Sequence, residues 1–188
     1  DAIVFDIGGG STELAWTRRG PGGERISLEV MSMPIGVVTL TEKYGGDYFE
    51  VETYRAMITE CMHRLDSFDA AHQISAKVEA GGVQMLGTSG TVTTLAGLRL
   101  NLKRYVRDLV DGTSLDFDDV RRLARDLAGM GFQDRAAYPC IGRERADLVV
   151  AGCAILEAIC EKWPVGRLRV ADRGVREGIL LGLLSQLG

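Results

Sequence analysis

The sequence predicts an α/β domain built on a five-stranded mixed sheet with helices on both faces. Its 188 residues are 46% hydrophobic and 26% charged, which is typical of a globular domain with a sizeable core. Short apolar runs bounded by turn residues alternate with longer segments that carry apolar residues at helical spacing. The segments follow one another in the order βββαβαβα, with a helical insertion. We expect residues 1–188 to form a single domain of this kind.

The first three strands are expected to form a meander over residues 2–6, 12–17 and 25–33. The first strand opens with four apolar residues in a row, which is typical of a buried strand. The connection between the second and third strands is rich in Gly and Pro, as turns are. Pro34 ends the third strand, because proline has no amide hydrogen to donate to a neighbouring strand.

Two helices are expected in the next part of the chain. A short helix runs from Val37 to Lys43 and stops at Gly45. A longer helix spans roughly residues 49–67, where apolar residues recur at helical spacing. Residues 69–82 are weakly patterned, and we expect no regular element there.

The second half of the chain is expected to supply the remaining two strands and the remaining helices. A helix begins after Asp116 and ends at Gly129. The segment 144–163 has the most continuous apolar pattern of all the expected helices. The other expected elements are strands 83–86 and 168–171 and helices 92–100 and 179–184.

The overall charge and the cysteines exclude several classes of function. The net charge is −4 and the isoelectric point is about 5.3, so the chain has no general attraction for nucleic acid or anionic membranes. The four cysteines form no C-x-x-C pair and have no histidine at zinc-ligand spacing. We therefore expect a reduced, cytoplasmic protein. No apolar run is long enough to span a bilayer, so no membrane partner is expected.

The loop between the first two strands is the first candidate site, and it reads Asp6-Ile-Gly-Gly-Gly-Ser-Thr-Glu13. Three adjacent glycines are costly to order, so a structural turn alone rarely uses them. Their bare backbone amides can approach a phosphate closely. The candidate phosphate ligands in this loop are Gly8, Gly9, Gly10 and Ser11. The alternative interpretation is a glycine-rich hairpin with a polar tip.

Two carboxylates flank this loop. Asp6 ends the strand beside the expected phosphate and would repel it unless a cation lay between them, which indicates Mg²⁺. Glu13 is expected to face the same pocket. We therefore take Asp6 and Glu13 as the candidate catalytic residues and metal ligands. Glu13 would either orient the attacking water or complete the metal shell.

A second candidate loop follows the strand 83–86 and leads into a helix. The candidate phosphate ligands there are Gly87, Thr88, Ser89, Gly90 and Thr91. A helix N-terminus carries partial positive charge and unpaired amides, both of which favour anions. The alternative interpretation is simple N-capping by one hydroxyl. Capping needs one Ser or Thr, whereas five lie between positions 88 and 94, which favours anion binding.

The two loops resemble those of the Ppx/GppA family of exopolyphosphatases and guanosine pentaphosphate phosphohydrolases. Asp6–Glu13 is similar to the family's phosphate loop, and Gly87–Thr91 is similar to its Gly-Thr-x-Gly-Thr loop. Hsp70 proteins have Thr-Phe-Asp where this chain has Ser-Thr-Glu, which favours the phosphatase branch. The resemblance covers residues 2–185 and includes three further segments. These are Pro34–Gly36, Arg145–Asp147 and Gly174–Gly178.

The resemblance implies a ribonuclease H-like lobe of the actin, Hsp70 and sugar kinase superfamily. It also implies that a homologous N-terminal lobe precedes this chain, which starts directly at the strand of the first loop. For the complete protein it implies hydrolysis of terminal phosphate from inorganic polyphosphate or guanosine pentaphosphate. In the family the glutamate credited with water activation lies in the first lobe. We therefore expect this chain to hold half of an active site.

Basic residues offer further contacts with a phosphate chain. Arg145 is interpreted either as a phosphate ligand or as one member of a helix-terminal ion pair. Lys103, Arg104 and Arg107 form the most basic cluster of the sequence. A solvated surface is the favoured interpretation of this cluster, and a guide for a polyphosphate tail is the alternative.

Two other functions remain as alternatives. The first is an ATP-binding lobe of a switch protein of the Hsp70, actin or kinase type, in which the same loops hold ATP and drive domain motion. The second is a binding or assembly module whose loops have decayed, although both loops keep their Gly, Ser and Thr residues. For the assembly of the protein, a homodimer is one of the open alternatives.

Overall fold

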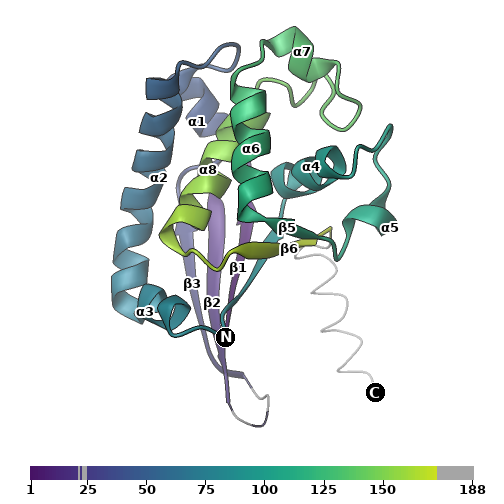
Figure 1. The fold of residues 1–188 in the computed structure, drawn as a ribbon. Helices are drawn as coiled ribbons and strands as arrows, with labels where there is room; N and C mark the ends of the chain where they lie inside the picture. The colour runs from purple at the N-terminus through teal and green to yellow at the C-terminus, as the bar shows by residue number, and fades with distance from the viewer. Residues whose placement is uncertain (21, 23–24, 173–188) are drawn as a thin grey trace, which may run out of the picture.

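The computed structural model describes residues 1–20, 22 and 25–172. Within these ranges one six-stranded mixed sheet has the strand order β3-β2-β1-β4-β6-β5 (Figure 1). Strand β1 pairs antiparallel with β2 and parallel with β4, so the chain's first strand lies near the centre of the sheet. The strands are β1 (Ala2–Ile7), β2 (Thr12–Arg19), β3 (Arg25–Met33), β4 (Gln84–Thr88), β5 (Ser114–Asp116) and β6 (Arg167–Ala171).

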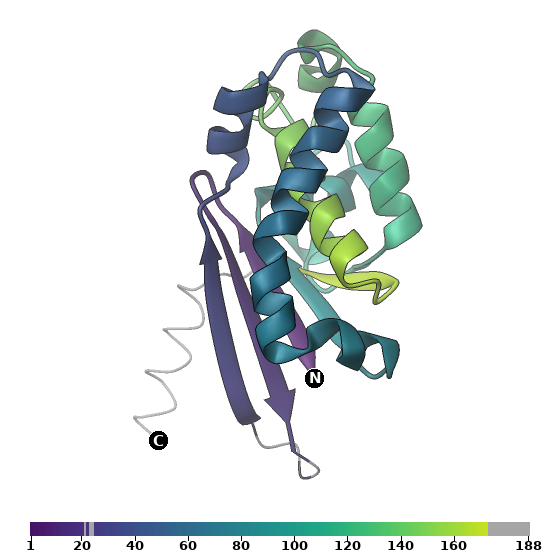
Figure 2. The same cartoon turned by 90° about the vertical axis from the view of Figure 1, so that its left-hand side faces the viewer.

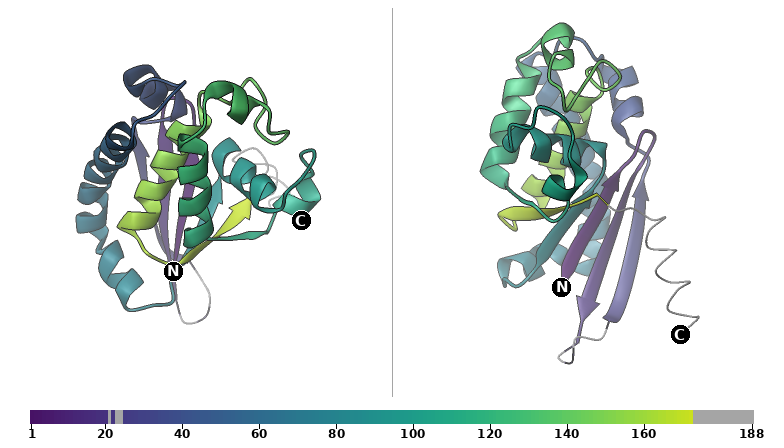
Figure 3. Two further views of the ribbon diagram at one scale, coloured as in Figure 1. Left: turned by 45° about the horizontal axis from the view of Figure 1, so that its top comes forward. Right: turned by 90° about the vertical axis from the view of Figure 1, so that its right-hand side faces the viewer.

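Helices cover one face of this sheet in the described part of the chain (Figures 2 and 3). Helix α8 packs centrally, against α2, α6 and β1. The helices are α1 (Val37–Tyr44), α2 (Val51–His72), α3 (Ile74–Glu79), α4 (Gly90–Arg99), α5 (Arg107–Val110), α6 (Phe117–Ala128), α7 (Phe132–Ala136) and α8 (Val149–Lys162). The helix expected at 179–184 and the Gly174–Gly178 segment lie outside the described residues.

The α/β fold class is confirmed, but the sheet has a strand that the sequence analysis omitted. Strand β5 is only three residues long, too short for an alternating pattern to reveal it. It forms because it pairs antiparallel with β6, a contact between residues about 50 positions apart. The expected count of five strands was therefore too low by one.

Three helix predictions also needed correction. Helix α2 continues to His72 and is followed by α3, in a region where no element was expected. The two helices are separated by Gln73, whose φ of 53° is left-handed, so no glycine marks the boundary in the sequence. Helix α8 begins at Val149 rather than at 144, because Arg145–Leu148 form tight turns. The short helices α5 and α7 were not predicted.

The core is built around α8, which is buried on nearly all sides. Eleven of its fourteen residues are buried, in keeping with its continuous apolar sequence. The four cysteines Cys61, Cys140, Cys153 and Cys160 are all free and buried. Among the described helices, none combines the length and the apolar character that crossing a bilayer requires.

Arg135 is a fully buried side chain that ties separate segments together. Its guanidinium donates hydrogen bonds to five backbone carbonyls, and its charge lies 5.7 Å from the ring centroid of Phe49. The carbonyls belong to Gly46, Asp47, Leu127, Met130 and Ala146. One arginine therefore joins the α1–α2 connection, the end of α6 and the turn before α8.

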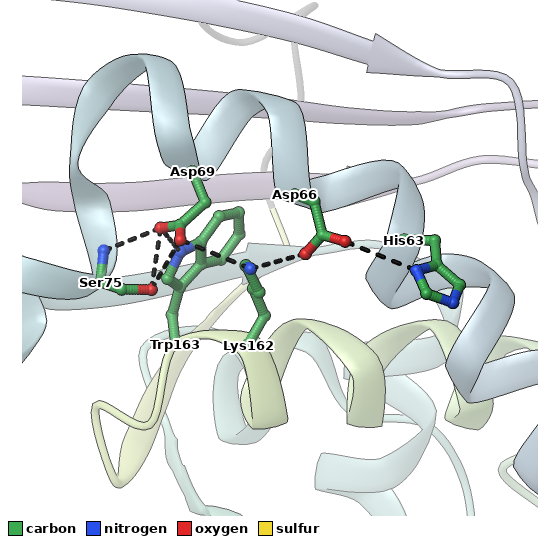
Figure 4. A network of polar contacts seen from close by, with 6 residues as sticks. All are labelled: His63, Asp66, Asp69, Ser75, Lys162 and Trp163. Atoms are coloured by element: carbon green, nitrogen blue, oxygen red, sulfur yellow. Dashed lines mark hydrogen bonds and ion pairs between the residues drawn. The ribbon is translucent and has the colours of Figure 1, made fainter.

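A polar network joins the end of α2 to the end of α8 (Figure 4). Asp69 Oδ1 accepts hydrogen bonds from the Trp163 indole nitrogen and from the Ser75 amide, both at 2.8 Å. Lys162 Nζ lies 3.4 Å from Asp69 Oδ2 and 2.8 Å from Asp66 Oδ1. Burial acts to raise the pKa of Asp69, but the hydrogen bonds from Trp163 and Ser75 and the charge of Lys162 hold it below the ordinary value of 3.8.

Replacing Asp69 by Ala is expected to lower the free energy of unfolding by about 1–3 kcal/mol, because the buried indole N–H of Trp163 loses its acceptor. A carboxylate with a lowered pKa stabilises the fold at neutral pH, and this stabilisation is lost as the pH falls through the folded-state pKa, below 3.8. Urea unfolding of both proteins at several pH values measures the effect. The difference between wild type and D69A should shrink in acid.

The matched control is Asp66→Ala. The Asp66 side chain is 57% exposed and contacts Lys162 without any bond to Trp163 or Ser75. Its loss should change stability much less than the loss of Asp69. Equal effects of the two substitutions, or a D69A effect that persists undiminished at acid pH, would contradict the role given to Asp69.

Candidate active site

The two glycine-rich loops lie side by side at one edge of the sheet. Each follows one of two parallel neighbouring strands, β1 and β4, in which Asp6 is paired in register with Thr88. Parallel strands place their carboxyl ends together, which is where ligands bind in open α/β sheets. A cavity of about 170 Å³ is lined by residues of both loops, among them Gly8, Gly9, Gly90 and Thr91. The predicted convergence of the two loops is therefore present.

Three amides of the first loop have no acceptor within residues 1–20, 22 and 25–172. The Gly8 amide donates to the Ser11 carbonyl at 2.8 Å, so it is used within the loop itself. The amides of Gly9, Gly10 and Ser11 make no hydrogen bond to any described residue. Gly9 and Gly10 are exposed. The amides available to an anion are thus those of Gly9, Gly10 and Ser11, one fewer than the sequence indicated.

The geometry of the second loop is compatible with both interpretations left open by the sequence, N-capping and anion binding. Ser89 does cap helix α4, since its Oγ accepts a hydrogen bond from the Val92 amide at 3.2 Å. The amides of Gly90 and Thr91, at the first turn, nonetheless have no acceptor among the residues described. Capping by one hydroxyl is therefore compatible with an anion site on the remaining amides.

Two of the predicted phosphate ligands, Gly87 and Thr91, pack against neighbouring elements of the fold. Gly87 is buried inside β4, and a β-carbon there would lie 2.5 Å from the ring of Phe5. Gly87 therefore allows the strands to pack and does not line the cavity. The Thr91 side chain is directed against Gly152 of α8, so only its amide faces the anion site.

The two carboxylates Asp6 and Glu13 form a cross-strand pair. They are opposite each other in the register of β1 and β2, on the face of the sheet away from the helices. Glu13 Oε1 accepts hydrogen bonds from Ser11 Oγ at 2.5 Å and from Ser32 Oγ at 3.1 Å. Partial burial, and then the charge of Glu13, raise the pKa of Asp6 above its ordinary value. Two such carboxylates favour a cation between them.

The sequence predicted one pocket, whereas the structure has two that adjoin at the first loop. Asp6, Glu13 and Thr88 line a second cavity of about 480 Å³, on the open face of the sheet. The loop connects the two, because Glu13 Oε2 lies 4.0 Å from the β-carbon position of Gly8, and Ser11 bonds to Glu13 directly. Amides and acids therefore approach the site from two sides of one loop.

The side chains that could bind a metal here suit Mg²⁺, which takes part of its ligands from phosphate and water, better than a metal whose ligands all come from the protein. No cluster of three or more His, Cys, Asp or Glu side chains occurs in the part of the chain that is described. Mg²⁺ is ordinarily bound through one or two carboxylates together with phosphate oxygens and water. Asp6 and Glu13 supply such a pair beside an anion site, with the Ser11 hydroxyl next to them.

Arg145 is the charged side chain of the first cavity, and the sequence left its role open. Its Nη1 lies 3.2 Å from the β-carbon position of Gly90. No carboxylate in the described ranges pairs with it, which disfavours the ion-pair interpretation. Arg135 holds this turn in place, since its Nε donates to the Ala146 carbonyl at 2.7 Å. The Arg-Ala-Asp segment was the only sequence signal for this residue.

Comparisons with known proteins identify the family to which this fold belongs. The profile of the Ppx/GppA phosphatase family matches residues 1–187. The chain is 28% identical over 189 residues to a Mycobacterium tuberculosis protein named Exopolyphosphatase 2, an alignment covering 96% of this chain and 55% of that protein. The chain therefore spans about half the length of the curated relatives it matches.

Solved structures show the same relation. A crystal structure of the Aquifex aeolicus member of the Ppx/GppA family matches with a TM-score of 0.81 and 27% identity, covering 100% of this chain and 57% of that one. The type II variant of the Aquifex aeolicus Ppx/GppA phosphatase matches with a TM-score of 0.79 and 28% identity, covering 96% of this chain and 56% of that one.

Proposed function

The chain belongs to the Ppx/GppA phosphatase family, and from this premise we propose that it supplies one half of a phosphoanhydride-hydrolysing cleft in the complete protein. The proposed substrates are inorganic polyphosphate and guanosine pentaphosphate, from which the terminal phosphate is released. One observation carries the proposal. Five amides, those of Gly9, Gly10, Ser11, Gly90 and Thr91, have no acceptor among the described residues and lie on two adjoining loops beside the paired carboxylates Asp6 and Glu13.

In this proposal the amides and Arg145 hold the terminal phosphoryl group. Phosphoryl transfer depends mostly on positioning and on stabilising negative charge, and bare amides in a fixed loop provide both. Water attacks the phosphorus, the bridging P–O bond breaks, and the shortened chain leaves with the bridging oxygen. The guanidinium of Arg145, on the cavity wall next to Gly90, is placed to neutralise charge on the equatorial oxygens.

Asp6 and Glu13 are the proposed Mg²⁺ ligands, in company with phosphate oxygens and water. Bound there, the metal would neutralise charge on the phosphate chain and polarise the phosphoryl oxygens. Ser11 and Ser32 orient Glu13 by hydrogen bonds to Oε1, which leaves Oε2 for a metal or a water molecule. Burial first and then the charge of Glu13 raise the pKa of Asp6, and a cation between the two acids would offset the repulsion that makes up the second of these causes.

A second lobe is proposed to complete the cleft and to supply the group that activates water. Phosphate release by the complete protein should be assayed on polyphosphate, guanosine pentaphosphate and ATP with Mg²⁺, beside the same assays on residues 1–188 alone. We expect turnover of polyphosphate or guanosine pentaphosphate by the complete protein and little or none by the 188-residue chain. Robust turnover by the chain alone would contradict the half-site proposal. Tight ATP binding without turnover of the other two would favour an ATP-dependent switch.

A further inference from the structure

The carbonyl groups of the first loop are held by the N-terminus of helix α1. The Val37 amide donates to the Gly8 carbonyl at 2.9 Å, and the Val38 amide donates to the Gly9 carbonyl at 2.8 Å. The first amides of a helix have no acceptor within the helix, and a capping side chain usually satisfies them. Gly36, at the N-cap of α1, has no side chain, so the loop carbonyls take that place.

This arrangement determines where the loop amides point. In a trans peptide unit the carbonyl and the following amide point in opposite directions. No cis peptide bond occurs in the described ranges, so this applies to the loop. The Gly9 amide shares its peptide plane with the Gly8 carbonyl, and the Gly10 amide shares its plane with the Gly9 carbonyl. Because α1 binds both carbonyls, the amides of Gly9 and Gly10 point away from α1.

Gly36 makes this contact possible through its lack of a side chain. A β-carbon on Gly36 would lie 2.6 Å from the Gly8 carbonyl oxygen and closer still to the carbonyl group of Gly9. These are backbone atoms, which cannot rotate aside as a flexible side chain can. The φ of Gly36 is −133°, which any residue can adopt, so space and not conformation requires glycine here.

Hydrogen bonds also fix the turn that leads from β3 through Gly36 into α1. The buried Thr12 hydroxyl donates to the Ile35 carbonyl at 2.8 Å, which joins the start of β2 to the turn before α1. The Gly36 amide donates to Thr39 Oγ1 at 2.9 Å. Thr12, which belongs to the first glycine-rich motif, therefore anchors the segment that orients the loop and does not face the anion site.

We propose that Gly36 is a positioning residue for the anion site: it lets α1 bind the loop carbonyls and so aims the amides of Gly9 and Gly10 at the terminal phosphate. The inference rests on the proposed function, because it assigns Gly36 a role in the same site. A misplacement of about 1 Å in a catalytic site can cost roughly 10²-fold in rate. The substitution Gly36→Ala should therefore lower kcat/KM of the complete protein for polyphosphate by about 10²-fold.

The test compares the complete protein with its G36A variant by three measurements, namely melting temperature, pyrophosphate affinity and Mn²⁺ affinity. Pyrophosphate binding reports on the loop amides, whereas Mn²⁺ binding reports on Asp6 and Glu13, which lie opposite each other on β1 and β2 and not on the carbonyls that α1 binds. We expect weakened pyrophosphate binding, unchanged Mn²⁺ binding and a folded protein. Gly129→Ala is the matched control, because the nearest atoms to a β-carbon there are 3.6 Å away. It should leave the melting temperature and both affinities unchanged.

A second variant keeps the inference testable if G36A fails to fold. Val37→Pro removes the amide that donates to the Gly8 carbonyl, and proline is well tolerated at the first helical position. It should also weaken pyrophosphate binding and leave Mn²⁺ binding intact. A folded G36A or V37P variant that binds pyrophosphate like the wild type would overturn the inference. Absence of phosphate release by the wild-type complete protein would instead refute the proposed function.

Discussion

Substituting Asp6 by Asn in the complete protein is expected to lower Mg²⁺-dependent phosphate release by about 10²–10⁴-fold, because a catalytic metal supplies several kcal/mol of charge stabilisation and each 1.4 kcal/mol is tenfold in rate. The amide of Asn keeps the size of the side chain but lacks the charge that holds a cation. Steady-state rates on polyphosphate across a range of Mg²⁺ concentrations measure the effect. The loss should appear at saturating substrate.

Comparing the melting temperatures of D6N and the wild type tests whether unfolding causes this loss. Like charges directly opposite on neighbouring strands are destabilising by up to about 1 kcal/mol, so D6N should be at least as stable as the wild type without metal. The control is Glu79→Gln, which removes an exposed acid on α3, at the other end of the sheet (Figure 1). Full activity in D6N, or equal losses in D6N and E79Q, would contradict the role of Asp6.

Substituting Arg135 by Met is expected to lower the free energy of unfolding by about 3–5 kcal/mol, because several carbonyls lose their donor and each unsatisfied buried group costs about 1–3 kcal/mol. Met fills part of the volume but leaves five backbone carbonyls without their donor. Arg135→Lys should rescue little, because one ammonium group cannot reproduce the planar fork that reaches separate segments. Guanidinium chloride unfolding measures both variants.

The control for this effect is Arg64→Met, which removes an exposed arginine from α2. Surface substitutions of this kind usually change stability by no more than about 0.5 kcal/mol. We also expect R135M to lose activity, because Arg135 holds the Ala146 carbonyl next to Arg145. An R135M protein as stable as R64M would show that the five hydrogen bonds contribute nothing net to the fold.

The parts of the site that the sequence predicted are those whose chemistry is local. Adjacent glycines followed by Ser and Thr indicate exposed amides whatever the surrounding fold, and the parallel pairing of β1 with β4 brings the two loops together as expected. Which of the amides are free could not be predicted. Gly8 uses its amide on Ser11, and Ser89 caps its helix, and both facts depend on the final path of the loops.

The parts that the sequence did not predict arise from contacts between distant segments. Arg135 looks like any other arginine in the sequence, and only the meeting of three segments makes it a buried donor. Gly36 was noticed as part of a proline–x–glycine segment, yet its closeness to Gly8 depends on how α1 meets the loop. Strand β5 exists only because β6 lies beside it. Propensity is too weak to specify such features.

In the proposed cleft, the amides of two loops hold one anion, and a cation lies between Asp6 and Glu13. The most direct measurement is a crystal structure of the complete protein with imidodiphosphate and Mn²⁺, whose anomalous scattering locates the metal. We predict Mn²⁺ between the two carboxylates and a phosphate group within hydrogen-bond distance of the amides of Gly9, Gly10 and Gly90. Phosphate bound elsewhere with these amides vacant, or Mn²⁺ away from both carboxylates, would contradict the account.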